Sequence, residues 1–343
     1  MMPLPELLRL GDIFLISFAV AALAAYPVYK LLIAWKSRQT VSQYAPEGHQ
    51  KKQGTPTMGG IIIVIGAAGG LLAYLLLGDP SRVSPALATT QVALILCLGF
   101  ALIGFLDDFI VPRLIPSKRG LGWKQKILMQ ILVAGLGMGL LYQWKLGLEF
   151  WIGLFLVLFF SNAYNFADGL DGLAGSLLLT LGLGLAALSV HAGAALDVPI
   201  AIAALMGAVI PFLFINAPPA RVFMGDVGSL PVGACLGLVV AELITQRSYE
   251  PAGVASGIDW WMTVPVAIAS FIMIAELVPV PLQILSVKLR KKKLFTYTPI
   301  HHAFEAKGWP ESRVVWTFAL MQLVLSGGAL YAFARITEAR HGP

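Results

Sequence analysis

The sequence predicts an all-α, polytopic membrane protein, and two observations lead to that prediction. The 343 residues are 58% hydrophobic and only 12% charged, with a mean hydropathy of +0.80. The apolar residues also fall in blocks of membrane-spanning length, about 20 residues per helix. Because the connections between these blocks are short, we expect residues 1–343 to form a single integral membrane domain.

Ten apolar blocks are candidates for transmembrane helices. They cover roughly residues 12–35, 59–78, 86–106, 125–143, 150–166, 173–191, 198–216, 229–246, 260–287 and 314–335. The first block is too long for a signal-peptide core and lacks a clear small-residue cleavage site, so we expect a retained helix. The ninth contains Pro279 and Pro281, which predict a proline-broken helix bordering a cavity or packed in protein. Cys97 and Cys235 lie inside apolar blocks and predict neither a disulfide nor a metal site.

The basic residues predict how the chain is oriented. With ten spans, most of the 24 Lys and Arg residues fall on one side, and the other side has only Arg9, Arg82, Lys145, Arg247, Arg335 and Arg340. The positive-inside rule makes the crowded side cytoplasmic and places both termini outside. The same rule accounts for the formal net charge of +6 without a nucleic-acid partner.

A polar stretch at residues 162–176 interrupts the apolar pattern. Asn162, Asn165, Asp168 and Asp171 recur every three residues, so on a near-helical backbone they are neighbours along one edge. The glycines among them let backbone approach a ligand, and the acids suit a hard cation such as magnesium. The alternative is a solvated loop joining two helices.

The other polar motifs fall on the same predicted cytoplasmic side. Asp107 and Asp108 end the third block, where a charge near the bilayer centre costs about 2.5 to 3.5 kcal/mol, so the pair predicts a bound cation or a proton to handle. The alternative is an interfacial pair that ends the helix. Asp226 lies among glycines after the seventh block, and Phe223 beside it suits stacking on a planar base or simple packing.

Basic residues accompany these acids. The 51–60 segment combines lysines, hydroxyls and glycines that suit an anionic ligand, although lysines beside anionic lipid are equally common. The basic run at residues 288–293 indicates either the orientation of the preceding span or part of a binding site. The paired His301 and His302 beyond it are a more specific sign of a site than the basic run. One face of the protein is therefore predicted to carry the chemistry.

Taken in order, residues 54–60, 107–108, 162–173, 223–229 and 299–309 resemble the signatures of the phospho-N-acetylmuramoyl-pentapeptide transferase (translocase I) family of the polyprenyl-phosphate N-acetylhexosamine-1-phosphate transferases. The resemblance covers nearly the whole chain. It implies a ten-helix enzyme of the bacterial inner (plasma) membrane, a homodimer, with a magnesium-dependent active-site cleft on the cytoplasmic face. The implied reaction transfers phospho-MurNAc-pentapeptide from UDP-MurNAc-pentapeptide to undecaprenyl phosphate, giving lipid I and UMP for peptidoglycan synthesis.

The resemblance also implies roles for individual residues. Asp226 is the implied magnesium ligand, and Asp107 and Asp108 are the catalytic acid pair, one of them a candidate base for the lipid phosphate. The residues implied to line the diphosphate and catalytic region are Asp168, Asn165, Lys126 and His301, with Lys52 and Thr57 at its rim. Asn162 and His302 are further implied substrate-binding positions. The implied nucleoside pocket is formed by Phe223, Asn216, Gly169, Leu170 and Asp171.

Two departures leave the donor sugar open. The family usually has three consecutive histidines where this chain has His301, His302 and Ala303. The Asn-Phe-Ala-Asp sequence at 165–168 and the Pro-Pro-Ala-Arg sequence at 218–221 resemble sister enzymes that transfer N-acetylglucosamine-1-phosphate or a related sugar. The 298–309 segment favours the muramoyl enzyme.

An ion-coupled transporter is the alternative from a different functional class. Intramembrane acids and proline-broken helices are also typical of such carriers. The chain shows no internal repeat, and its acids gather at one face instead of the bilayer midplane. Both observations argue against transport.

Overall fold

The computed structural model describes residues 3–35, 54–77, 89–115, 118, 120–245 and 257–341. These ranges contain helices and no β-strand, and Lys52 lies outside them. In chain order the elements are α1 (Leu4–Ala34), α3 (Ile61–Leu77), α4 (Thr89–Phe105), η2 (Leu106–Ile110), α5 (Val111–Leu114), α6 (Trp123–Leu141), α7 (Leu148–Ala167), α8 (Leu173–His191), α9 (Asp197–Asn216), α10 (Asp226–Ile244), α11 (Trp260–Ala269), α12 (Phe271–Leu277), α13 (Pro279–Arg290), α14 (His301–Glu305) and α15 (Glu311–His341).

Each of the ten apolar blocks contains a helix. Within the described ranges, nine helical stretches have the length and hydropathy needed to cross a membrane. The block at 59–78 gives α3, which is apolar throughout but has 17 residues. An all-helical, polytopic membrane protein is therefore confirmed, while the count of ten spans stays a prediction.

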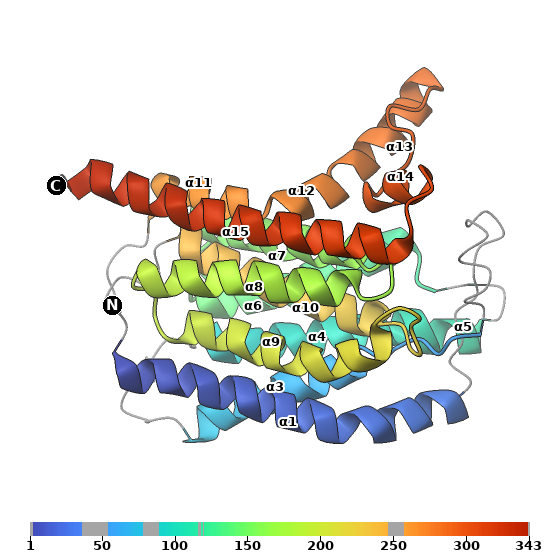
Figure 1. Cartoon of the computed structure of the whole chain (residues 1–343), viewed down its shortest axis with the longest axis horizontal. Coiled ribbons are helices and arrows are strands. Elements are labelled where there is room, and N and C mark those ends of the chain that lie inside the picture. Colours follow the sequence, from blue (N-terminus) through green and yellow to red (C-terminus); the bar gives the residue numbers. More distant parts are fainter. Residues whose placement is uncertain are drawn as a thin grey trace.

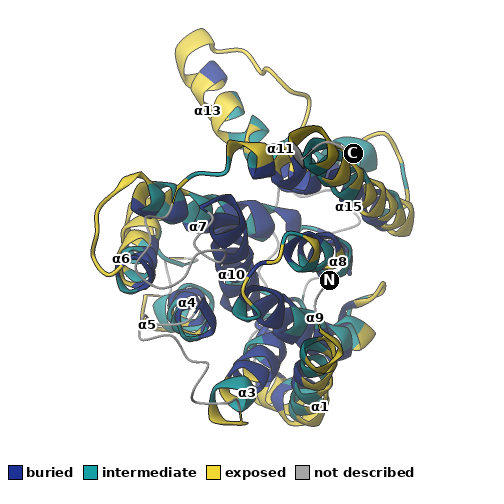
Figure 2. Cartoon of the chain, turned by 90° about the vertical axis from the view of Figure 1, so that its left-hand side faces the viewer, coloured by how far each residue is buried: buried dark blue, intermediate teal, exposed yellow. Residues whose placement is uncertain are grey.

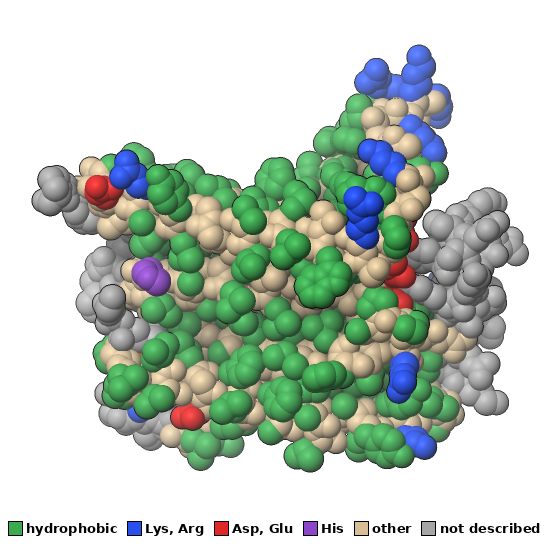
Figure 3. Space-filling view, viewed as in Figure 1, with side chains coloured by type: hydrophobic (Ala, Val, Ile, Leu, Met, Phe, Trp, Pro, Cys, Tyr) green, Lys and Arg blue, Asp and Glu red, His purple; other side chains and the backbone are tan. Residues whose placement is uncertain are grey.

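Helix α10 is the centre of the bundle. All of its residues from 227 to 244 are buried, and it contacts α4 and α7 most extensively and α3 and α9 to a smaller extent. Figure 2 shows this helix enclosed by its neighbours. Outer helices expose apolar side chains such as Leu23 of α1, Leu132 of α6 and Val324 of α15, and Figure 3 shows hydrophobic side chains over the flank of the bundle. Such a surface suits lipid.

Two glycine contacts bring backbones together at the start of α10. A β-carbon on Gly60 would overlap with the Cα atom of Gly228, and one on Gly104 would overlap with the backbone of Asp226 and Val227. Small residues at helix crossings allow this close approach in membrane proteins. The ends of α3 and α4 are therefore fixed directly against the first turn of α10.

The ninth block forms three helices. The chain breaks first at Ser270, between α11 and α12, and again at Val278, before Pro279 opens α13. Pro279 therefore breaks the helix as expected, but Pro281 lies inside the first turn of α13, where its missing N–H has no helical partner to lose. In Figure 1, α13 projects from the bundle, and Figure 3 shows Lys and Arg side chains gathered on it.

The two termini lie at the same end of the bundle in Figure 1. The opposite end carries the C-terminal ends of α4 and α7 and the N-terminal ends of α6 and α10, because these helices alternate in direction. Four of the predicted site residues, Asp107, Lys126, Asn165 and Asp226, lie on or beside those helix ends. The fold thus gathers the polar motifs at the end away from the termini.

Candidate functional site

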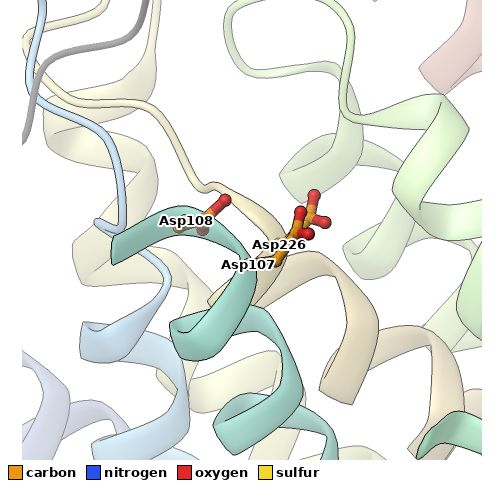
Figure 4. Close-up of side chains that lie close together, drawn as sticks. All are labelled: Asp107, Asp108 and Asp226. Atoms are coloured by element: carbon orange, nitrogen blue, oxygen red, sulfur yellow. The ribbon is translucent and has the colours of Figure 1, made fainter. Parts of the chain in front are cut away.

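Three aspartates form a cluster at this end of the bundle. Asp107 and Asp108 lie on η2, a π-helical turn that continues α4, and Asp226 is the first residue of α10. One carboxylate oxygen from each lies within 4.8 Å of the others (Figure 4). A π-turn is wider than an α-turn and is common at functional sites. It brings two consecutive acids toward the same partner.

The ammonium group of Lys126 lies between two of these acids. Its Nζ atom is 3.4 Å from Asp107 Oδ2 and contacts Asp226 Oδ2 directly. All three side chains are less than one-fifth exposed, so their charges interact in a partly desolvated setting. The lysine therefore neutralises part of the negative charge that the cluster concentrates.

Backbone N–H groups hold the acid pair of η2. Leu121 N donates to Asp107 Oδ1 at 2.6 Å, and Val227 N donates to Asp108 Oδ2 at 3.2 Å. Each carboxylate is thus tied to a different segment, one before α6 and one in the first turn of α10. The two neighbours in sequence are oriented independently.

Asn165 and Asn162 have different partners. Asn165 Nδ2 donates to Asp226 Oδ1 at 2.7 Å and to Ser229 Oγ at 2.8 Å, so this amide orients the third aspartate. Asn162 Nδ2 instead donates to Gln130 Oε1 at 2.9 Å, on α6. Only Asn165 contacts the aspartate cluster, although both follow the three-residue spacing of the sequence.

Asp168 lies just after α7, beside the cluster. Burial and the negative charges of Asp226 and Asp108 raise the pKa of the Asp168 carboxyl well above its ordinary value. A backbone hydrogen bond from Gly225 opposes that shift in the pKa. This carboxyl therefore holds a proton to higher pH than an aspartate in water.

The paired histidines occupy different settings. His301 opens α14 with no exposed surface; its Nδ1 is 2.9 Å from Glu276 Oε2, and its Nε2 lies against Gly169. His302 is partly exposed, and its Nδ1 is 2.7 Å from Glu305 Oε2. The two rings are 4.2 Å apart. His301 therefore reaches the loop that carries Asp168, whereas His302 faces its own helix turn.

Thr57 and Phe223 come together through two paired segments. Phe223 N donates to Pro56 O at 2.9 Å, which aligns the end of the first long connection with the loop before α10. Both the Thr57 hydroxyl and the Asp108 carboxylate lie next to Gly225, whose φ of 72° is left-handed. Glycine is suited to that backbone conformation, and it leaves room for both polar groups.

The remaining predicted residues tie two loops together. Asn216 Oδ1 accepts from Gly172 N at 3.0 Å, and Asp171 Oδ2 accepts from Ala220 N at 2.9 Å. Leu170, between the polar residues of this loop, is buried in the hydrophobic core. These contacts fix the 168–172 loop against the loop that follows α9.

The sequence reasoning assigned no site role to Ser229, Gln130 or Glu276. Helical spacing was the available signal for two of them, since Ser229 follows Asp226 by three residues and Gln130 follows Lys126 by four. Glu276 was visible only as an acid within an apolar block. Its partner, His301, is 25 residues away in sequence.

The cluster fits a divalent cation. Three carboxylates converge, and carboxylate oxygens are the ligands that hard divalent ions take in proteins. Lys126 supplies positive charge to two of these carboxylates. The donor set and the need for a counter-charge both agree with a metal site.

Comparisons with known proteins identify the family. A model of glycosyl transferase family 4 matches residues 90–244, and signature 1 of the phospho-N-acetylmuramoyl-pentapeptide transferases matches residues 52–64. A phospho-N-acetylmuramoyl-pentapeptide transferase of Heliobacterium modesticaldum is 37% identical over 331 residues, which cover 91% of this chain and 94% of that protein. Proteins of the same name from Moorella thermoacetica and Bacillus subtilis are 35% and 32% identical, covering 89% and 92% of this chain and 92% and 95% of their own. The chain belongs to the phospho-N-acetylmuramoyl-pentapeptide transferase family.

The matched segments of this transferase coincide with the site. The family 4 model extends from α4 to α10 and so contains the three aspartates, Lys126 and Asn165. The signature at residues 52–64 contains Thr57 and the segment that pairs with Phe223. The transferase therefore carries its family matches on the same residues that the fold brings together.

Proposed function

We propose that the transferase moves phospho-MurNAc-pentapeptide from UDP-MurNAc-pentapeptide to undecaprenyl phosphate, forming lipid I and UMP. An oxygen of the lipid phosphate attacks the sugar-linked phosphorus of the donor. The new P–O bond forms as the phosphoanhydride bond to UMP breaks, and UMP leaves with that bond's electron pair. The observation that carries this proposal is the cluster of Asp107, Asp108 and Asp226 around Lys126 in a chain of this family.

Charge is the main obstacle to this reaction, because donor and acceptor are both anionic. Magnesium held by Asp226, with Asp107 and Asp108 beside it, would supply Lewis-acid charge to the donor diphosphate. Lys126 supplies a second positive charge at the same place, fixed by its two acidic partners. Fixed charges that need no reorganisation are effective in phosphoryl transfer.

The acids also offer a route for the proton of the lipid phosphate. Asp107 and Asp108 are held by separate backbone donors, so one can accept the proton while the other would help to hold the cation. Asp168, whose carboxyl has a raised pKa, lies near both the cluster and the 169–172 turn.

The donor nucleotide takes the rim of the site in this proposal. Phe223 is partly exposed and stacks on the uracil base. The loop tied by Asn216 and Asp171, with Gly169 and Leu170 in it, forms the pocket wall, and Thr57 and Lys52 complete the phosphate side. Asn162 and His302 contact more distant parts of the substrates.

We also propose that this end of the bundle faces the cytoplasm of the bacterial inner membrane. The termini lie at the other end, the projecting α13 carries Lys288 and Arg290 at the site end, and the positive-inside rule places such residues inside. Ten spans then follow if α3 crosses the membrane. The homodimer is proposed from the family resemblance alone.

The test is UMP release by the purified protein in detergent with undecaprenyl phosphate and magnesium. We expect turnover with UDP-MurNAc-pentapeptide and none with UDP-N-acetylglucosamine. Turnover with the second donor alone would move the protein to the sister transferases. No release from either donor would reject phosphoglycosyl transfer and make transport the next reaction to assay.

The metal assignment has its own variant. Asp226→Asn keeps the size of the side chain and loses one ligand charge, so we expect magnesium-dependent UMP release to vanish while the thermal unfolding temperature stays close to that of the wild type. Asp12→Asn, on the exposed face of α1, is the matched control. Full activity of Asp226→Asn would defeat the metal assignment.

A further inference from the structure

Glu276 and His301 form a buried acid–imidazole pair beside the aspartate cluster. Glu276 lies on α12 and His301 opens α14, and neither side chain has any exposed surface. Glu276 Oε2 and His301 Nδ1 are 2.9 Å apart, within hydrogen-bond distance. The broken ninth helix thus carries a carboxylate into the protein interior to meet this ring.

Stability does not account for the pair. Desolvating a carboxylate is costly, and replacing a buried ion pair with apolar residues of similar volume often leaves a protein equally stable or more stable. A membrane-spanning segment such as Phe271–Arg290 makes a buried acid still more expensive. Stability alone therefore does not explain why residue 276 is an acid paired with a histidine.

The contact with Glu276 assigns the donor once Glu276 is ionised. An ionised carboxylate only accepts hydrogen bonds, so Nδ1 of His301 is then the donor to Glu276. The other nitrogen, Nε2, is buried and has no hydrogen-bond partner among the described residues, and neither has Glu276 Oε1. A buried ring nitrogen without a partner costs free energy unless a ligand completes it.

The Nε2 atom of His301 faces the 168–172 loop. Nε2 lies against Gly169, where a β-carbon would overlap with it, and Asp168 is the preceding residue. Gly169 has no side chain, so on this side only backbone atoms separate the His301 ring from the space beyond the loop. For Nε2 to contact a substrate phosphate, the 168–172 loop would have to shift away from the ring.

We propose that Glu276 is a positioning residue that orients His301 and favours its doubly protonated ring, so that Nδ1–H stays bonded to Glu276 and Nε2–H is presented to a phosphate oxygen of the nucleotide-linked donor. The substrate part of this inference rests on the proposed function. Glu276 itself touches no substrate and acts only through His301. His302, whose ring is 4.2 Å away, is bonded to Glu305 and does not replace this contact.

Kinetics of three variants test the role. Glu276→Leu removes the acceptor, and we expect kcat for UMP release to fall by about 100-fold with a KM for the donor within about threefold of the wild type. Glu276→Gln keeps an oxygen that can accept from Nδ1, so its kcat should fall by no more than about 10-fold. Glu242→Leu, an equally buried acid at the far end of α10 from Asp226, is the control and should stay within about threefold.

A double variant separates positioning from general damage. If Glu276 acts through the ring alone, Glu276→Leu combined with His301→Gln should be no slower than His301→Gln by itself. If Glu276 had a merely structural role, the loss of kcat from Glu276→Leu would add to the loss from His301→Gln in the double variant. Additive losses would therefore overturn the proposal, as would a kcat for Glu276→Leu equal to that of the control.

A spectroscopic arm does not depend on turnover. The chain has five histidines, so ring nitrogen-15 signals of histidine-labelled protein can be assigned by comparison with His301→Gln. We expect protonated Nδ1 at His301 in the wild type, lost in Glu276→Leu and kept in Glu242→Leu. An unprotonated Nδ1 in the wild type would overturn the positioning role of Glu276, whether or not the protein is active. Inactivity with both donors would instead overturn the proposed function, so the two failures can be told apart.

Discussion

Substitution of Lys126 by methionine tests the electrostatics of the site most directly. The change keeps most of the side-chain volume and removes the charge that lies between Asp107 and Asp226. At the 3.4 Å separation of Lys126 Nζ and Asp107 Oδ2, one charge pair is worth about 5 kcal/mol before desolvation, at an effective dielectric constant of about 20. Breaking a mostly buried pair leaves an uncompensated acid, and a net loss of about 3 kcal/mol is expected.

That loss should depend on the metal. Without divalent cations, about 3 kcal/mol should lower the unfolding temperature by roughly 5–10 °C. With saturating magnesium, the ion restores positive charge to the cluster, so most of this loss should disappear. The assay is thermal unfolding in detergent, with chelator and with magnesium, followed by intrinsic fluorescence.

Lys124→Met is the matched control for this variant. Lys124 lies two residues earlier in the same helix, is exposed, and has its Nζ atom 5.6 Å from the Trp123 ring. Its replacement should cost little, because exposed charges contribute at most about 1 kcal/mol. The reasoning is refuted if Lys126→Met loses no more stability than Lys124→Met in chelator, or loses as much in magnesium as without it.

Three further outcomes follow from the structure. Gly60→Ala would place a methyl group on the backbone of Gly228, so we expect a loss of about 1–3 kcal/mol by thermal unfolding, whereas Gly11→Ala, with open space around it, should lose nothing. Asp168→Asn should raise the unfolding temperature at pH 8 in chelator and leave it unchanged near pH 4. The pKa of the Asp168 carboxyl is raised in the folded state, so the folded state binds more protons than the unfolded state. The carboxyl therefore destabilises the folded protein only at a pH above its pKa in the unfolded state. An equal or lower temperature at pH 8 would contradict that assignment. Ala303→His lies on a partly exposed position of α14 and should keep or mildly raise UMP release; loss of folding would show that the histidine turn is built differently here.

The sequence was sufficient for the helices because membrane spans follow from hydropathy alone. Each apolar block contains a helix, and Pro279 broke the ninth as expected. The break at Ser270 has no such signal in the sequence, since serine is tolerated within helices. The π-turn at Asp107 was equally invisible, because a single inserted residue in a helix leaves the hydropathy pattern unchanged.

Spacing along one helix indicated which residues share an edge, but it did not determine which partners they bond to in the fold. The three-residue spacing suggested that Asn162 and Asn165 share one edge, yet the structure directs one to Gln130 and the other to Asp226. Asn216 and Asp171 bond to backbone groups of facing loops, a contact that no local pattern contains. Tertiary packing decides such partners, so the roles of these residues stay predictions.

The complete enclosure of α10 bears on how the protein is made. A ribosome delivers the chain from the N-terminus, so Asp107 and Asp108 enter the membrane well before Asp226 is synthesised. Helices α3, α4 and α7 cannot complete their packing first, because α10, which lies between them, is made later. The packing of α3, α4 and α7 around α10 is therefore completed only after α10 is made, and a nascent chain that stops before residue 226 lacks the third aspartate of the cluster.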